Sequence, residues 1–187
     1  MRAALDIPVL QSERPRLRPW REEDLQPYAQ FCANAATARF LGDVCGREDA
    51  WRRIAMFIGH WTLRGYGNWA IEEKVTGRWI GYSGLWRPEG WPEAEVMWGL
   101  AADCHGHGYA TEAGRCARDF AYRELGWRTL ISCIAPANMA SQRVAARLGA
   151  VRERDMELRG GDIGIYRHPG PRGTASVNCK RCETRRR

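Results

Sequence analysis

A glycine-containing loop between an expected strand and an expected helix restricts this chain more than any other feature. The stretch is His105-Gly106-His107-Gly108-Tyr109-Ala110-Thr111-Glu112-Ala113, with a strand expected over residues 93–101 and a helix over residues 109–125. Two glycines and an alanine let the backbone approach a ligand closely. The free N–H groups of the first helical turn, together with the helix dipole, favour an anion such as a pyrophosphate. The stretch therefore predicts a phosphate site.

Three other interpretations of this loop stay open from the residues alone. It could be an ordinary strand-to-helix turn, because glycine turns are common. It could begin a nicotinamide-dinucleotide fingerprint at Gly106 and Gly108, but the third glycine is replaced, and the next expected strand, residues 129–135, supplies no acid for a ribose. His105 and His107 could chelate a metal ion, although no acidic or thiol partner is evident beyond the neighbouring cysteine.

The remaining hydrophobic pattern predicts an irregular order of strands and helices. We expect a strand over 16–20, helices over 22–34 and 47–63, strands over 68–74, 78–86 and 93–101, a helix over 109–125, a strand over 129–135, a helix over 138–148 and a hairpin from 151–158 and 163–168. The inner face of the second helix should carry Trp51, Ile54, Ala55, Ile58 and Trp61. This order indicates a mixed α/β (α+β) domain and not the regular alternation of a doubly wound sheet.

Length and charge indicate one domain followed by a basic tail. The chain has 187 residues and a formal charge of +7, and such a length suits one domain, which we place at residues 1–168. From residue 171 onward there are six cations and one acid, so the last seventeen residues carry +5 and residues 1–170 carry +2. We expect residues 169–187 to be a disordered tail. Because the folded part carries so little net charge, we expect no specific nucleic-acid partner.

The cysteines and the apolar segments indicate a cytoplasmic protein. The seven cysteines are odd in number and irregularly spaced, which favours reduced thiols. Cys179 and Cys182 form a lone CxxC, and without a second ligand pair it is weak evidence for zinc. No apolar run approaches 18 residues, and the N-terminus lacks the apolar core of a signal peptide. We therefore expect no membrane partner and no metal.

The loop and several other segments together resemble the GNAT acetyltransferases. That family carries a loop of the form Gln/Arg-x-x-Gly-x-Gly/Ala, which here would be residues 105–110, with His105 in place of the usual Gln or Arg. The continuation through residue 113 is similar to the branch of ribosomal-protein N-terminal alanine and serine acetyltransferases. Supporting segments are Leu17-Arg18-Pro19-Trp20, Trp79-Ile80-Gly81-Tyr82-Ser83-Gly84-Leu85, Pro136-Ala137-Asn138-Met139-Ala140-Ser141-Gln142-Arg143-Val144 and Leu148-Gly149. The resemblance covers residues 14–168.

This resemblance implies a fold, a co-substrate and a reaction. The fold would be that of acyl-CoA N-acyltransferases, a central, mostly antiparallel, twisted sheet flanked by helices. Acetyl-CoA would be the co-substrate, and a primary amine, on a protein N-terminus or a small molecule, would attack it directly in a ternary complex. A non-catalytic acyl-CoA-binding sensor of the same fold is the alternative. The sequence does not name the acceptor amine, and a homodimer is the expected oligomeric state.

The resemblance also implies which residues hold acetyl-CoA. The implied cofactor-binding residues are Trp98, Gly99, Leu100, His105, Gly106, His107, Gly108, Tyr109, Ala110, Thr111 and Asn138. The backbone around Gly99 would pair with the pantetheine amides as an added strand, and the loop would hold the pyrophosphate. Two of these assignments have structural alternatives: Thr111 suits the first turn of any helix, and Asn138 could be only an N-cap.

The implied catalytic residues are Glu95 and Ser141. Glu95 lies on the strand that enters the loop, where many GNAT enzymes place a glutamate that acts as a base through water; the alternative is an exposed strand carboxylate. Ser141 would be an acid or a contact of the thiol, with a helix cap as the alternative. The family's usual acid, a tyrosine seven residues after the asparagine, is replaced by Ala145. Trp20, Trp86 and Trp91, near expected element ends, could line an acceptor cleft.

Overall fold

The computed structural model describes residues 6–40, 42, 44–171 and 180–182. Its elements in chain order are β1 (Val9–Gln11), β2 (Pro15–Arg18), η1 (Glu22–Asp24), α1 (Leu25–Ala33), α2 (Ala35–Ala38), α3 (Arg47–Arg64), β3 (Asn68–Glu73), β4 (Trp79–Trp86), β5 (Glu95–Leu100), η2 (Ala102–Cys104), α4 (Tyr109–Arg123), β6 (Ile131–Ile134), α5 (Met139–Arg147), β7 (Val151–Leu158), β8 (Gly161–Arg167) and β9 (Lys180–Cys182).

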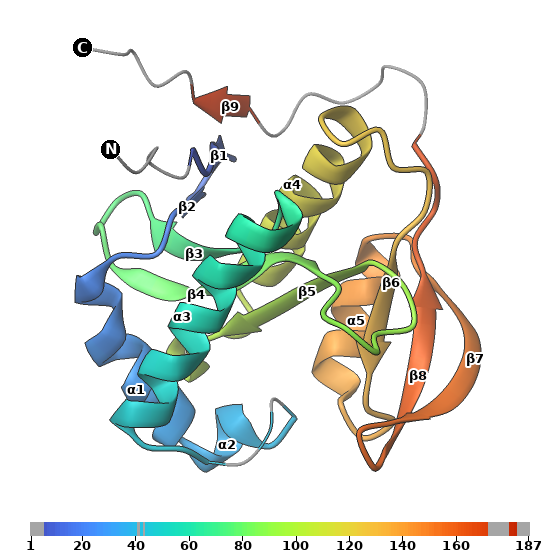
Figure 1. Ribbon diagram of the computed structural model, residues 1–187, viewed down its shortest axis with the longest axis horizontal. Helices are drawn as coiled ribbons and strands as arrows, with labels where there is room; N and C mark the ends of the chain where they lie inside the picture. The colour runs from blue at the N-terminus through green and yellow to red at the C-terminus, as the bar shows by residue number, and fades with distance from the viewer. Residues whose placement is uncertain (1–5, 41, 43, 172–179, 183–187) are drawn as a thin grey trace.

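The described strands form one sheet in the order β7-β8-β6-β5-β4-β3-β2-β1-β9 (Figure 1). Every neighbouring pair is antiparallel except β5 and β6, which run parallel. The expected mixed α/β class with a mostly antiparallel sheet is therefore confirmed. The long chain connection that a parallel pair requires is supplied here by α4.

Helices cover both faces of the sheet, as alternating strand side chains require. On one face, α4 packs Ala113, Ala117 and Phe120 into a core with residues of β2 to β5. On the other face, α1 and α3 enclose an aromatic core in which Trp20 stacks on Phe57 with 5.6 Å between ring centroids. The sheet is thus covered on both faces along β3 to β5.

The expected elements all form, but the inward face of α3 differs from the prediction. Trp51 is 54% exposed and Ile58 is 37% exposed, whereas Ala50 and Phe57 are buried. Ile54 and Trp61 are buried as expected. The prediction is therefore confirmed at these two positions, and at the other positions the buried face of α3 differs from the expected one. The reason is tertiary: the ring of Phe57 fills the aromatic core beside Trp20.

Short edge elements and one cysteine also differ from expectation. The short elements β1, α2 and β9 are not among those expected from the sequence, and β1 (Val9–Gln11) pairs with β9 (Lys180–Cys182) at the sheet edge. The rest of the expected tail, 172–179 and 183–187, lies outside the described residues, as does Cys179, so the domain boundary at residue 168 stays a prediction. Cys116 is disulfide-bonded, so the expectation of reduced thiols is wrong there. Cys32, Cys45, Cys104 and Cys133 are free thiols.

No helix in the described part of the chain combines the length and apolar character needed to cross a membrane.

Candidate active site

The sheet opens between its two parallel strands. Within the described residues, β5 and β6 form one ladder pair, Glu95 with Ile131, and Ser132 Oγ donates a hydrogen bond to Val96 O across 2.6 Å. Beyond that point the strands diverge toward their carboxyl ends (Figure 1). One edge of β5 is therefore left open from Met97 onward. An extended chain of amides could pair with this edge as an added strand does.

Gly99 lies in the open part of β5, directly opposite Tyr82 on β4. A Cβ at Gly99 would stand 2.6 Å from Tyr82 Cε1, well inside van der Waals contact. The absence of a side chain therefore lets the Tyr82 ring cross β5 and reach the aromatic core. This close packing is the observed reason for a glycine here.

The expected phosphate loop presents a helix N-terminus. Gly106 and Gly108 have φ of +81° and +87°, a left-handed conformation that glycine adopts without strain. Gly108 occupies the N-cap of α4, and no side chain caps the helix there. Thr111, which is 8% exposed, has its Oγ1 buried without a hydrogen-bond partner among the described residues. Uncapped N–H groups and an unpartnered hydroxyl together fit an anion.

Protein contacts fix the loop from behind. His105 Nε2 lies 2.9 Å from the carbonyl oxygen of Leu100, so this ring holds the start of the loop. The hydroxyl of Tyr109 donates to Glu73. Arg14 donates to the carbonyl of His107 across 2.8 Å. The side chains of His105 and Tyr109 are thus occupied by protein atoms, which leaves the loop backbone to contact a ligand.

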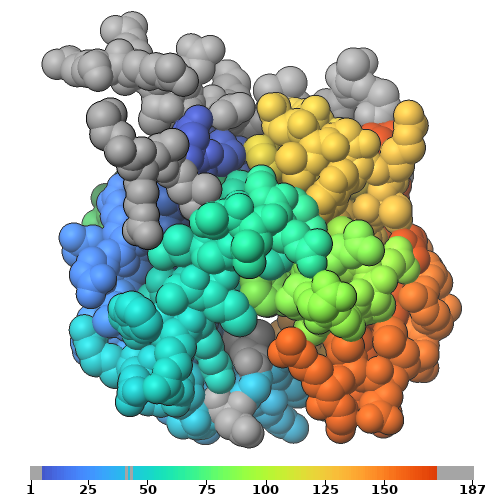
Figure 2. All heavy atoms as spheres, viewed as in Figure 1, coloured from blue at the N-terminus to red at the C-terminus, as the bar shows by residue number. Residues whose placement is uncertain are grey.

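Two cavities meet in the opening of the sheet. The loop cavity, of about 550 Å³, is lined by Ala36, Thr37, Phe40, Trp98, Gly99, Leu100, Cys104, His105, Gly106, Gly108, Ala110, Thr111, Asn138, Ala140, Ser141, Arg143, Val144 and Arg147. It brings together every residue expected to bind the cofactor except His107 and Tyr109. The aromatic cavity, of about 500 Å³, lies between the helices of the α1–α3 region and the β7–β8 hairpin, where Figure 2 shows the surface hollowed. Phe40, Trp98, Asn138 and Ser141 line both cavities.

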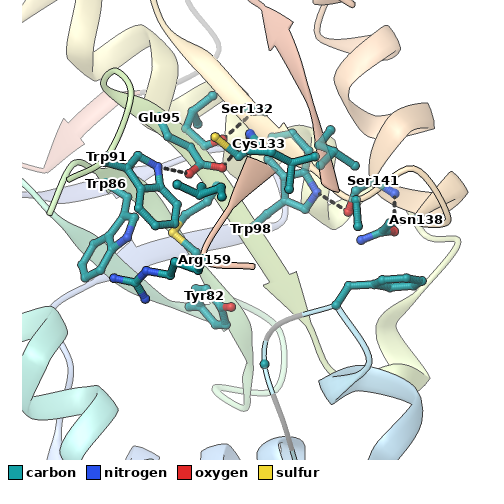
Figure 3. A pocket seen from close by; sticks show the side chains of 18 of the residues that line it. Tyr82, Trp86, Trp91, Glu95, Trp98, Ser132, Cys133, Asn138, Ser141 and Arg159 are labelled. Atoms are coloured by element: carbon teal, nitrogen blue, oxygen red, sulfur yellow. Dashed lines mark hydrogen bonds between the residues drawn. The ribbon is translucent and has the colours of Figure 1, made fainter. Parts of the chain in front are cut away.

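Glu95 projects into the aromatic cavity from the first residue of β5 (Figure 3). Its side chain accepts hydrogen bonds from Trp91 Nε1 across 2.7 Å and from the N–H of Cys133 across 2.9 Å. The residue is only 4% exposed, so the alternative of an exposed strand carboxylate is wrong. Burial raises the pKa of Glu95 to about 7, against the lowering effect of the two hydrogen bonds. Such a carboxyl can gain or lose a proton near neutral pH.

Ser141 lies at the junction of the two cavities. Its hydroxyl accepts a hydrogen bond from Trp98 Nε1 across 3.3 Å, and its N–H donates to Asn138 Oδ1 across 3.1 Å (Figure 3). Asn138 therefore does cap α5, the structural alternative for this residue, while it also lines both cavities. Ala145 is fully buried against Ile134 and offers no hydroxyl. Ser141 is thus the hydroxyl placed at the junction.

The tryptophans expected at an acceptor cleft divide into two groups. Trp86 and Trp91 line the aromatic cavity, whereas Trp20 is buried in the core beside Phe57. Sequence reasoning missed Tyr82 and Arg159, which also line this cavity. Tyr82 is a core residue by its strand pattern, and Arg159 lies on a hairpin turn whose position only the fold determines.

Comparisons with known proteins agree with this architecture. The curated protein YkkB of Bacillus subtilis (strain 168) is 31% identical over 107 residues, which cover 55% of this chain and 62% of YkkB, so the match spans less than two thirds of that relative. The crystal structure of an acetyltransferase from Agrobacterium tumefaciens str. C58 is 30% identical, covers 90% of this chain and 98% of that one, and has a TM-score of 0.79.

A more distant structure shares the fold. RimL, a ribosomal L7/L12 α-N-protein acetyltransferase solved in complex with coenzyme A, is 20% identical, covers 86% of this chain and 97% of that one, and has a TM-score of 0.70. Residues 14–151, well over half of the chain, match the family model of the acetyltransferase (GNAT) domain. The chain therefore belongs to the GNAT acetyltransferase family.

Proposed function

We propose that this protein transfers an acetyl group from acetyl-CoA to a primary amine by direct attack in a ternary complex. The observation that carries the proposal is the common wall of the two cavities, formed in part by Trp98, Asn138 and Ser141. A thioester bound in the loop cavity and an amine bound in the aromatic cavity would meet at this wall. Holding two reactants together in this way removes much of the entropic barrier to their reaction.

Acetyl-CoA would bind along the opening of the sheet. The pyrophosphate would accept hydrogen bonds from the first turn of α4 and from Thr111 Oγ1, which has no other described partner. The pantetheine amides would pair with the open edge of β5 between Met97 and Leu100. RimL, which shares this fold, was solved in complex with coenzyme A, and this supports coenzyme A as the kind of ligand that the opening holds.

Glu95 would act as the general base. An amine must lose a proton before its nitrogen can attack, because an ammonium group has no lone pair; free amines have pKa values from about 8 to about 10.4. With a pKa of about 7, Glu95 is substantially ionised at neutral pH and can accept this proton directly or through a water. The nitrogen then bonds to the thioester carbon.

The remaining steps need a donor for the oxyanion and a proton for the departing sulfur. Unpaired N–H groups on the open edge of β5 would donate to the tetrahedral oxyanion. When the carbon–sulfur bond breaks, the thiolate would take a proton from Ser141 Oγ, which lies at the junction of the cavities. Ser141 would regain a proton from solvent, and Glu95 would release one, so the net reaction yields an amide and free coenzyme A.

An acetylation assay tests the proposal. Purified protein would be incubated with acetyl-CoA and a panel of primary amines, and both acetylated product and free thiol would be measured. We expect stoichiometric formation of the two products with at least one amine. Binding of acetyl-CoA by calorimetry without turnover of any amine would instead support the sensor alternative.

A further inference from the structure

The aromatic cavity is a preformed apolar slot. Tyr82 and Trp86 both pack against Phe57, with ring centroids 5.4 Å and 5.6 Å away, and both are buried. Trp91 and Trp98 add two further indole rings to its lining. Because these rings are held by neighbours on other elements, they do not need to reorganise around a ligand. Such walls favour a flat apolar body on the acceptor.

The charges of this cavity do not suit a polycation. Among its described lining residues, Glu95 is the acidic side chain, and Arg53 and Arg159 are the cations. Glu95 has a pKa near 7, so it carries only part of a negative charge at neutral pH. An acceptor with several ammonium groups would meet the guanidinium of Arg159 and, in Glu95, one partly ionised carboxyl among the described lining residues.

Arg159 is held in an unusual position at the mouth of the cavity. It is the residue with φ of +54° at the turn between β7 and β8, a conformation that is unfavourable for a side chain of this size. Its guanidinium carbon lies 5.1 Å from the centroid of the Trp91 ring (Figure 3). The fold thus keeps this cation over the indole that itself donates to Glu95.

The other described arginines of the hairpin are paired with acids, and Arg159 differs from them. Arg152 pairs with Asp155 on the same strand, and Arg154 and Arg167 both pair with Glu93. Within the described part of the chain, no carboxylate lies within ion-pair distance of Arg159. A guanidinium held at a cavity mouth without an acid is suited to a carboxylate from outside the protein.

Resting on the proposed function, we infer that the acceptor is an amino acid, or a close analogue, with a flat apolar side chain. Its carboxylate would bind the guanidinium of Arg159, its amine would face Glu95, and its side chain would occupy the aromatic slot. Trp91 links the two ends of this arrangement, because its ring lies beneath Arg159 and its Nε1 binds Glu95. Arg159 is thus a specificity-determining residue.

Four amines separate the features of this acceptor. L-phenylalanine carries the amine, the carboxylate and the flat apolar side chain. Phenylalaninamide and phenethylamine lack the carboxylate, and spermidine carries several cations. We expect the wild-type protein to show kcat/KM at least tenfold higher for phenylalanine than for the other three. In the variant Arg159→Gln, kcat/KM for phenylalanine should fall at least tenfold, while that for phenethylamine changes less than threefold. Arg159→Lys should recover part of the loss.

A matched variant and a binding measurement separate the possible failures. Arg152→Gln, on the same hairpin but outside the cavity lining, should leave all four substrates unchanged. Equal loss for phenylalanine and phenethylamine in Arg159→Gln, or a wild-type preference for spermidine, would overturn this inference alone. Acetyl-CoA binding with no turnover of any amine would overturn the proposed function as well.

Discussion

Trp91 Nε1 donates a hydrogen bond to Glu95 Oε2 across 2.7 Å inside the aromatic cavity. The bond stabilises the charged form of the carboxyl and so opposes the rise in pKa that burial causes. Trp91 comes from the segment before β5, whereas the second donor, the N–H of Cys133, comes from β6. Two separate segments therefore tune one acid to a pKa of about 7.

Replacing Trp91 by Phe should raise the pKa of Glu95, because the ring remains while the donor is lost. One hydrogen bond to a charged group corresponds to about 1 pKa unit or more. We expect the acidic limb of the kcat/KM profile to move to higher pH by about that amount. Trp86→Phe is the matched control, since Trp86 lines the same cavity and makes no hydrogen bond to Glu95 that the structure describes. An unmoved limb in Trp91→Phe would contradict the account.

Thr111 provides a test of the phosphate site that preserves shape. Its Oγ1 is buried without a described partner, so Thr111→Val removes a hydroxyl of no evident structural use. If that hydroxyl binds the pyrophosphate, the Kd for acetyl-CoA should rise roughly tenfold or more, as expected for a hydrogen bond to a charged group. Calorimetric titration measures this, and Thr62→Val, on the exposed face of α3, should leave the Kd unchanged. Equal affinity in the two variants would refute the role of Thr111.

His168 should make the folded state sensitive to acid. Burial lowers the pKa of His168 to about 3. Ser132 Oγ donates its proton to Val96 O, so it accepts a hydrogen bond from Nε2 of the His168 ring. Nδ1 is then unprotonated, and it is buried without a hydrogen-bond partner among the described residues. Below pH about 6.5, His168 is protonated in the unfolded chain but remains neutral in the folded protein. Stability from this residue is therefore complete above that pH and is lost as the pH falls toward 3.

The contribution of Glu95 to folding stability changes with pH in the opposite direction over part of this range. Its folded pKa of about 7 lies above the ordinary value of 4.5, so its contribution falls as the pH rises from 4.5 to 7. The two residues should offset one another between pH 4.5 and 6.5, and His168 should dominate below pH 4.5. Below pH 4.5, the free energy of unfolding measured with urea should fall as the pH falls, in both wild type and His168→Gln. The slope should be steeper in wild type by about 1.4 kcal/mol per pH unit. Identical slopes would contradict this assignment.

Local patterns were sufficient to predict the elements that carry the loop. The glycines at 106 and 108 need positive φ and stand between a strand and an amphipathic helix, so β5, the loop and α4 follow from adjacent residues. The pairing of β1 with β9 joins three-residue strands about 170 positions apart, and no local pattern specifies such a contact. The face of α3 depends likewise on packing by α1 and β4.

The site shows the same division. The helix N-terminus at the loop could be predicted, because it is a local structure, and binding of a phosphate there stays a prediction. The burial of Glu95 and its hydrogen bonds from Trp91 and Cys133 could not be predicted, since they depend on how separate segments pack together. Arg159 could not be placed either, because its contact with the ring of Trp91 joins two segments that are far apart in the sequence.

Transfer of a proton from the attacking amine to Glu95 can be tested by measuring kcat/KM against pH for wild type and Glu95→Gln. The base is needed while the amine is protonated and is superfluous once the amine is free. We predict a loss of about 10²-fold or more at pH 7 that shrinks toward unity above the pKa of the amine, with acetyl-CoA affinity unchanged. A ratio that stays constant across this pH range would contradict the assignment of Glu95 as the base.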